Sequence, residues 1–269
     1  MLVFVENKGS VGSRIRETNK NNQGESMNRL INKVAIITGS SSGIGRGIAS
    51  AFAKEGAITV LASRRKSELE ITAEQIGKEG SELLVVPTDV TREEEVERLF
   101  KKSVESFGRV DILINSAGIS ASGPTEDLTL KVWRNVLAVN LTGAFLCSRE
   151  ALRIMQPRCC GRIINVGSVS AKVPRTYSAA YTTSKFGLEG LTRSMALDAR
   201  EYGISVSVLH PGNTNTQLWE GREEIAEREG VMDPYDVARA VTLMASLPKE
   251  LNMIESTILP VSMPFLGRG

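Results

Sequence analysis

The sequence contains few of the residues on which disulfide-bonded and metal-binding proteins depend. Its 269 residues include only three cysteines, Cys147, Cys159 and Cys160. The number is odd and the spacing contains no CxxC motif, so the pattern indicates neither a disulfide framework nor a zinc site, and we expect no bound metal. Such sparing use of cysteine is typical of the reducing cytoplasm, where we expect the protein to be located.

Histidine is scarcer still. The one histidine of the chain, His210, stands directly before Pro211 and Gly212. A histidine with no partner nearby in the sequence argues against a Ser-His-Asp hydrolase, because His210 would have to serve as its general base.

The sequence also lacks long apolar runs and an excess of one charge. No apolar run approaches the roughly 20 residues that a membrane helix needs. The opening residues 1–5 are too few for the hydrophobic region of a secretory signal and have no basic flank before them. The formal net charge is +2, with acidic and basic residues interspersed. We therefore expect neither a membrane nor a nucleic acid as a partner.

The chain divides into a polar beginning and one long patterned region. Residues 1–28 are rich in Asn, Ser, Lys and Glu and lack hydrophobic periodicity, so we predict a disordered N-terminal extension. Met27 falls where the ordered pattern begins and is an alternative start of the chain. Residues 29–269 are predicted to form a single domain, since folds of the α/β class often run undivided to roughly 250 residues.

Within that domain, short apolar runs alternate with longer amphipathic segments. Runs of strand length lie at 34–38, 58–62, 83–86, 112–115, 162–166, 206–210 and 257–259, and helical segments at 44–55, 68–79, 92–107, 130–155, 178–201 and 234–246. This alternation predicts the α/β class, as one doubly wound Rossmann domain whose seven-stranded parallel sheet is flanked by helices. Ligands bind such sheets beyond the carboxyl ends of the strands.

A glycine-rich turn follows the first predicted strand. Residues 38–45 read TGSSSGIG, in which the cofactor-binding candidates are Gly39, Ser41, Gly43, Ile44 and Gly45. Glycines permit tight turning and close approach of the backbone, and the helix that follows offers free N–H groups to a pyrophosphate. The turn therefore predicts a dinucleotide site, although the same pattern also occurs in ordinary strand-to-helix connections.

The end of the second predicted strand bears on the choice of cofactor. An NAD site usually has Asp or Glu here, to accept hydrogen bonds from the ribose 2′-hydroxyl. This chain has Ser63 and then Arg64, which favours the 2′-phosphate of NADP, because a guanidinium pairs well with phosphate oxygens. The alternative is that Arg64 and Arg65 only form the solvated approach to the next helix.

Two further strand ends carry polar or small residues. Asp89 and Val90 follow the third strand and are candidates for contact with the adenine, although Asp89 would also suit a helix cap. Asn115, Ala117 and Gly118 follow the fourth strand and would let a cofactor lie close over the backbone. Each pair or triplet falls where the predicted fold places ligands.

Tyr181 and Lys185 are one helical turn apart if the segment around them is a helix. A phenol and an ammonium on one helix face form a unit that can handle a proton. The pair alone is not specific, since it also describes a tyrosine at a helix start with a solvated lysine beyond it.

Taken in order, these motifs resemble those of the short-chain dehydrogenases/reductases. The likeness extends from about residue 33 to 245 and comprises the TGxxxGIG turn at 38–45, Asp89, a variant of NNAG at 115–118, Asn140, Ser168, YxxxK at 181–185, and Pro211 and Gly212 with Thr216. Ser116 stands where the commonest family motif has a second Asn, and we expect only a local effect.

The resemblance implies a role for each matched residue. Tyr181 would be the general acid and base, Ser168 would position the substrate oxygen, and Lys185 would hold the nicotinamide ribose. Asn140 would support a water-linked proton path to Lys185. Ser168 as a cap and Asn140 as a packing or kink residue are the alternatives. The cofactor-binding set implied by the resemblance also includes Pro211, Gly212 and Thr216.

The same likeness leads us to expect an NADP(H)-dependent oxidoreductase that interconverts a small-molecule carbonyl and a secondary alcohol, as a homodimer or homotetramer. A substrate lid is expected at about 213–233, where Leu218 and Trp219 are candidates either for pocket walls or for anchors of the lid to the core. The tail after Leu247 resembles the branch of 3-hydroxy acid and serine dehydrogenases. Two alternatives remain: a 3-oxoacyl thioester reductase of acyl-carrier protein, and a non-catalytic NADP-sensing regulator.

Overall fold

The computed structural model describes residues 28–265 apart from residue 79 and residues 218–222. The predicted N-terminal extension, apart from residue 28, and the candidate wall residues Leu218 and Trp219 lie outside this part of the chain. The last four residues also lie outside it.

The centre of the molecule is a seven-stranded parallel sheet with the strand order β3-β2-β1-β4-β5-β6-β7. The strands are β1 (Val34–Thr38), β2 (Ile58–Ser63), β3 (Leu83–Pro87), β4 (Ile112–Asn115), β5 (Gly161–Val166), β6 (Ile204–Pro211) and β7 (Glu255–Ile258). Every residue of β1, β4 and β6 is buried, as is typical of parallel strands that are covered on both faces. The predicted fold class and the seven strands are confirmed.

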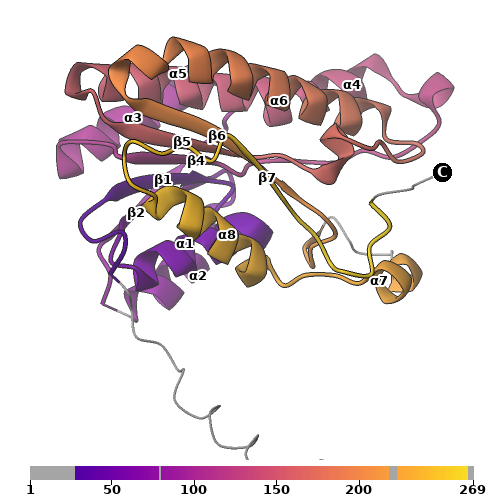
Figure 1. Cartoon of the computed structure of the whole chain (residues 1–269), viewed down its shortest axis with the longest axis horizontal. Helices are drawn as coiled ribbons and strands as arrows, with labels where there is room; N and C mark the ends of the chain where they lie inside the picture. The colour runs from indigo at the N-terminus through magenta and orange to yellow at the C-terminus, as the bar shows by residue number, and fades with distance from the viewer. Residues whose placement is uncertain (1–27, 79, 218–222, 266–269) are drawn as a thin grey trace, which may run out of the picture.

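Helices cover both faces of the sheet, as Figure 1 shows. The first face carries α1 (Gly43–Lys54), α2 (Lys66–Gly77) and α8 (Pro234–Ser246), and their apolar residues form one buried cluster with the sheet. The opposite face carries α3 (Glu93–Phe107), α5 (Gly143–Met155) and α6 (Ala179–Asp198), which form the second cluster. The sheet therefore lies between two separate hydrophobic cores, as in a doubly wound fold.

The segment predicted as one helix over 130–155 is interrupted. The chain forms α4 (Leu130–Leu137), a wider π-helical turn over Ala138–Thr142, and then α5. Asn140 lies within this turn and is buried. Its side chain forms hydrogen bonds with the backbone of Ile119, which is distant in the sequence, and no local sequence pattern encodes this interaction. Most other element ends agree with the sequence-based ranges to within about two residues.

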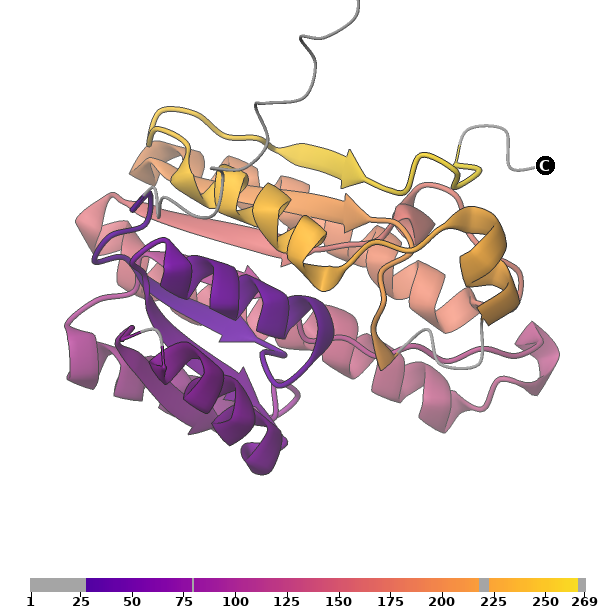
Figure 2. The ribbon, with the colours of Figure 1, turned by 90° about the horizontal axis from the view of Figure 1, so that it is seen from below.

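The order of the strands reverses at β1, which has β2 on one side and β4 on the other. The carboxyl ends of the strands point toward the side of the molecule where α7 (Glu223–Glu229) lies (Figure 2). The crevice beyond this reversal is where ligands bind in open α/β sheets.

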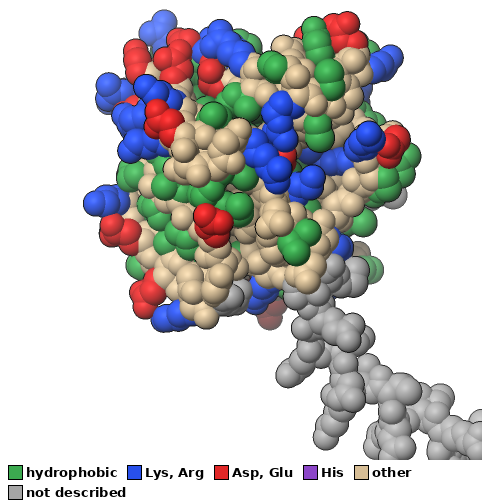
Figure 3. Space-filling model, turned by 90° about the vertical axis from the view of Figure 1, so that its left-hand side faces the viewer, with side chains coloured by type: hydrophobic (Ala, Val, Ile, Leu, Met, Phe, Trp, Pro, Cys, Tyr) green, Lys and Arg blue, Asp and Glu red, His purple; other side chains and the backbone are tan. Residues whose placement is uncertain are grey.

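The described helices include none that is long and apolar enough to cross a membrane. Acidic and basic side chains are both present on the face shown in Figure 3.

Candidate functional site

A cavity of about 1070 Å³ lies at the carboxyl ends of the strands. Most residues that the sequence predicts for the site line it. These are Gly39, Ser41, Gly43, Ile44, Gly45, Ser63, Arg64, Asp89, Val90, Ala117, Gly118, Ser168, Tyr181, Lys185, Pro211, Gly212 and Thr216. Asn115 and Asn140 are buried and lie behind the wall.

The glycine-rich turn lets two backbone segments approach each other closely. Gly39 has a φ of +69°, and a Cβ there would lie 2.9 Å from the backbone of Ala117. A Cβ at Gly45 would collide with the carbonyl group of Gly39. The hydroxyl of Thr38 accepts hydrogen bonds from the backbone N–H groups of Ser116 and Ala117, at 3.1 and 3.2 Å. The turn after β1 is thus held directly against the turn after β4.

The start of α1 is suited to an anion. The helix has no acidic residue in its first turn, and the side chain of its N-cap, Ser42, does not bond to the first N–H groups of the helix. These N–H groups and the positive end of the helix dipole therefore face the cavity, which fits the pyrophosphate of a dinucleotide.

Arg65 reaches across the glycine-rich turn, which the sequence did not predict. Its guanidinium donates to the hydroxyls of Ser41, at 3.2 Å, and Ser42, at 2.8 Å. Ser63 also donates to Ser41, at 2.8 Å, while Arg64 is exposed beside the cavity. Both arginines therefore line the cavity at the end of β2, and Arg65 is the one in contact with the turn.

Asp89 lines the cavity but also has a local role. Its carboxylate accepts from the backbone N–H of Thr91 at 3.0 Å and from the Thr91 hydroxyl at 2.8 Å. These bonds form a local turn before α3 and not the helix cap that the sequence left open as an alternative, because the N-cap of α3 is Arg92 and no side chain caps that helix. Val90 packs against Gly143, where a Cβ would lie 2.7 Å from a Val90 methyl group.

Asn115 joins β4 to its neighbours rather than facing the cavity. Its amide donates to the side chain of Asn165 on β5, at 2.8 Å, and to the hydroxyl of Ser148 on α5, at 2.9 Å. The structure thus gives Asn115 a supporting position, whereas the sequence predicted direct contact with a cofactor.

Asn140 clamps the backbone of Ile119, which does line the cavity. Its side-chain oxygen accepts from the Ile119 N–H at 2.8 Å, and its amide donates to the Ile119 carbonyl at 2.9 Å. The amide also donates to the hydroxyl of Ser184, at 3.0 Å, and that hydroxyl donates to the carbonyl of Tyr181, at 2.6 Å. Asn140 therefore connects the turn after β4 with the first turn of α6.

Tyr181 and Lys185 lie together on α6, as their spacing predicts. The ammonium of Lys185 is 5.7 Å from the centre of the Tyr181 ring and donates to the carbonyl of Val166 at 2.8 Å. Lys185 is buried, and burial lowers the pKa of its ammonium to about 8. A Cβ on Gly118 would be 3.6 Å from the Asn140 oxygen and 3.9 Å from the Lys185 nitrogen, so these two side chains border the same small residue.

Ser168 lies two residues after the end of β5 and caps a short helical turn. Its hydroxyl oxygen accepts from the N–H of Ser170 at 3.1 Å. Because that bond uses a lone pair, the hydroxyl proton stays available as a donor toward the cavity.

Residues of the segment 211–217 and of α7 also line the cavity. Thr216 packs against Gly43, with a Cβ there 3.0 Å from the Thr216 methyl group. Arg175, from the loop after β5, pairs with the buried Glu229 at the end of α7, at 2.7 Å. Asn213 bonds to both, accepting from Arg175 at 2.8 Å and donating to Glu229 at 3.0 Å.

Comparison with known proteins shows which family this chain is similar to. The family model described as short chain dehydrogenase matches residues 33–226. An uncharacterized oxidoreductase of Staphylococcus aureus (strain MRSA252) is 34% identical over 235 residues, covering 87% of this chain and all of that protein. The uncharacterized oxidoreductase YxjF of Bacillus subtilis (strain 168) is 33% identical, covering 81% of this chain and 84% of that protein.

Two solved structures are similar as well. A dehydrogenase/reductase from Sinorhizobium meliloti 1021 has a TM-score of 0.80 and 33% identity, and the match covers 88% of this chain and 98% of that one. A short-chain type dehydrogenase/reductase from Mycobacterium marinum has a TM-score of 0.80 and 28% identity, with 87% and 96% covered.

Proposed function

The chain belongs to the short-chain dehydrogenase/reductase family of oxidoreductases, and we propose that it interconverts a carbonyl and a secondary alcohol with NADP(H), with Tyr181 as general acid and base. The observation that carries the proposal is the placement of Tyr181 beside the buried Lys185, in the wall of a cavity that also contains the glycine-rich turn. A proton donor and a dinucleotide cradle in one cavity are the two requirements of carbonyl reduction.

The residues present fit a nicotinamide dinucleotide. The turn over residues 39–45 and the start of α1 would hold the pyrophosphate, and Ser63, Arg64 and Arg65 would hold the 2′-phosphate. Lys185 would bind the nicotinamide ribose through its ammonium, and the bound cofactor would supply or accept the hydride.

The proposed proton transfer takes place at the Tyr181 hydroxyl. In the reducing direction it gives its proton to the substrate oxygen, which Ser168 holds with the hydroxyl proton left free by its bond to Ser170. The Lys185 ammonium stabilises the resulting tyrosinate electrostatically. Asn140 fixes the backbone of Ile119 beside Lys185, at the start of the proposed water-linked path.

The experiment that tests this function is a panel of ketones, aldehydes and acetoacetyl thioesters with NADPH, together with hydroxy acids with NADP⁺, followed by NADPH absorbance. We expect turnover of at least one compound class. Preference for the thioester would favour 3-oxoacyl reduction. Tight NADPH binding without turnover of any compound would contradict the proposal and support a sensing role.

The charge of Lys185 should make cofactor binding depend on pH. Because the pKa of its ammonium is lowered to about 8, the charge is lost as pH rises through that value. We expect the Kd for NADPH to increase about fivefold between pH 7 and pH 9.5, the size of a modest charge-assisted contact. Fluorescence titration across this range would measure it. Lys185→Met should bind more weakly and show no such step; an equal step in this variant would assign the titration to another group.

The pairing of Arg175 with Glu229 is proposed to hold the lid, the segment over about 213–233, against the cavity. Burial raises the pKa of Glu229, but hydrogen bonds from Asn213 and Arg175 outweigh it and hold the pKa below its ordinary value. Glu229→Gln is expected to raise the substrate KM about tenfold, since one charged hydrogen bond contributes about 1.5–3 kcal/mol. The same change at the exposed Glu227 is the matched control. An unchanged KM for Glu229→Gln would contradict the lid assignment.

A homodimer or homotetramer is also proposed. Leu130, Phe186 and Leu197 on α4 and α6 are exposed apolar side chains, which is typical of surfaces that contact a second subunit. Gel filtration with light scattering would test this, and a monomer at micromolar concentration would contradict it.

A further inference from the structure

His210 has contacts that its position in the sequence does not reveal. It lies near the end of β6 and is completely buried. Its Nδ1 is 2.9 Å from the carbonyl oxygen of Ser168 and 3.3 Å from the Ser168 nitrogen. The ring packs directly on Gly167, where a Cβ would lie 2.6 Å from Nδ1. Glycine at this position therefore allows the imidazole to reach the backbone of Ser168.

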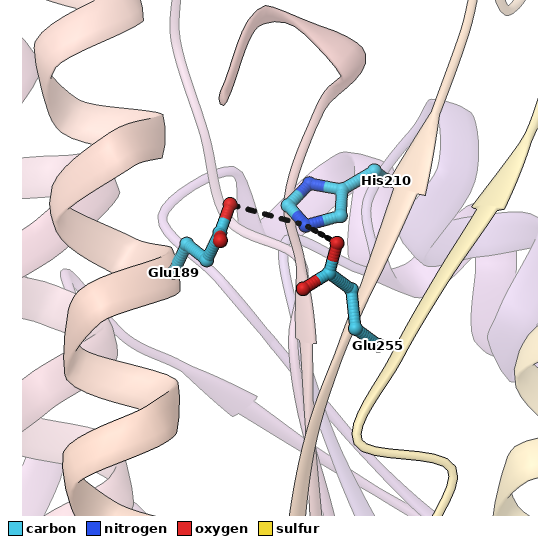
Figure 4. Close-up of side chains that lie close together, drawn as sticks. All are labelled: Glu189, His210 and Glu255. Atoms are coloured by element: carbon cyan, nitrogen blue, oxygen red, sulfur yellow. Dashed lines mark ion pairs between the residues drawn. The ribbon is translucent and has the colours of Figure 1, made fainter. Parts of the chain in front are cut away.

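The other ring nitrogen faces two carboxylates, which Figure 4 shows approaching from α6 and β7. Nε2 lies 3.6 Å from Glu189 and 4.0 Å from Glu255. His210 therefore lacks a partner among its neighbours in the sequence, but the fold brings two carboxylates close to it. Within the described residues, neither Nε2 nor the nearer Glu189 oxygen has a hydrogen-bond partner.

The three side chains are close enough to hold a metal ion, but the chain itself supplies the positive charge between the carboxylates. Lys172 pairs with Glu189 at 2.7 Å and with Glu255 at 2.6 Å. Arg193 also pairs with both, at 2.6 and 3.0 Å. Two cations balance two anions, so the cluster is an ion-pair network that surrounds the far side of the imidazole.

The contact with Ser168 indicates which ring nitrogen carries the proton. The shorter contact, at 2.9 Å, needs Nδ1 to donate to the Ser168 carbonyl oxygen, whereas the longer one, at 3.3 Å, needs an unprotonated Nδ1 that accepts from the Ser168 N–H; we base the inference on the shorter contact. Burial, together with the charge of Lys172, lowers the pKa of His210, although the Ser168 bond and the two glutamates act in the opposite sense. The ring is therefore neutral at pH 7, with one proton, and the shorter contact with Ser168 favours Nδ1 as its position.

On the basis of the function proposed above, we infer that His210 is a positioning residue for Ser168. Its Nδ1–H holds the Ser168 carbonyl, while the Ser170 N–H holds the Ser168 hydroxyl oxygen. Together the two bonds fix the backbone and the side chain of the residue that would orient the substrate oxygen. The network of Lys172, Glu189, Glu255 and Arg193 lies on the far side of the imidazole and comes from three other parts of the fold.

The proton position can be read on the unmodified protein. Because the chain has one histidine, ¹⁵N-histidine labelling of tag-free protein gives one pair of ring-nitrogen resonances. We expect Nδ1 protonated and Nε2 unprotonated at pH 7. A ring protonated at Nε2 with Nδ1 bare would overturn the inference, and this measurement requires no variant.

Two matched variants test the effect on catalysis. In His210→Asn the amide takes the place of Nδ1 and can still donate to Ser168, whereas in His210→Gln it takes the place of Nε2. We expect His210→Gln to lower kcat about tenfold and His210→Asn to retain kcat within about threefold, because small misplacements at a reacting centre are costly. The Kd for NADPH should be unchanged in both.

Equal kcat values in the two variants, or losses that follow thermal stability alone, would overturn the inference. Should both variants fail to fold, the proton position in the unmodified protein decides. A parallel Tyr181→Phe assay separates the two levels of the proposal. If Tyr181→Phe stays active, the proposed function fails; if it is inactive while His210→Gln matches the wild type, only the positioning role fails.

Discussion

Replacement of Tyr181 by phenylalanine is expected to lower kcat for carbonyl reduction by about 10²–10⁴-fold, the usual contribution of a positioned general acid. The change removes one oxygen and keeps the ring, so the packing against Lys185 should survive. The glycine-rich turn and Arg65 are untouched by the change. We therefore expect the Kd for NADPH to change by less than about twofold.

The matched control for this change is Tyr177→Phe. Tyr177 lines the same cavity but is 60% exposed, and the residue four places after it is Tyr181 rather than a lysine. Its spacing therefore does not match the pair that Tyr181 and Lys185 form on α6. Steady-state kinetics with the best substrate of the panel should show kcat within about threefold of wild type for Tyr177→Phe. A Tyr181→Phe enzyme of similar activity would refute the assignment.

The second large effect is expected at the cofactor phosphate. Ser63→Asp combined with Arg64→Ala should lower kcat/KM with NADPH by about 10²–10³-fold, since each charge-assisted hydrogen bond contributes about 1.5–3 kcal/mol and the new carboxylate repels the phosphate. The same carboxylate should accept the ribose hydroxyls of NADH, so that cofactor preference reverses.

Single variants separate the contributions of the two arginines. Arg64→Ala and Arg65→Ala should each weaken the binding of NADPH. Arg64→Ala should leave kcat/KM with NADH nearly unchanged, because NADH has no 2′-phosphate. Arg65→Ala also removes the hydrogen bonds to Ser41 and Ser42, so we expect this variant to show a small decrease in kcat/KM with NADH as well. A wild-type preference for NADH, or equal losses with both cofactors in Arg64→Ala, would contradict the phosphate assignment.

The features that the sequence predicts well are those encoded by local spacing. Buried parallel strands such as β1 are largely apolar, and the glycine-rich turn requires glycines at fixed intervals. Tyr181 and Lys185 are neighbours because four residues make about one helical turn. Each of these follows from a few consecutive residues, and each is found where the pattern places it.

Features that depend on distant contacts were not predictable in this way. Arg65 bonds to Ser42 because β2 lies beside β1, and His210 meets Glu189 and Glu255 because α6 and β7 pack around β6. Asn115 is a further example, since its partners on β5 and α5 draw it behind the cavity wall. In each case the fold decides which side chains meet, and the local sequence contains no trace of the partner.

The interruption before α5 changes the phase of a long helix. Each residue of an α-helix turns the following chain by about 100°, so the extra residue in the wide turn over Ala138–Thr142 offsets all of α5 by that angle relative to α4. Deleting one residue there would restore a continuous helix and rotate Leu146, Cys147 and Ala151 away from the sheet. The register of the second hydrophobic core therefore depends on the same turn that holds Asn140 against Ile119, so a change in the length of this segment would disturb both together.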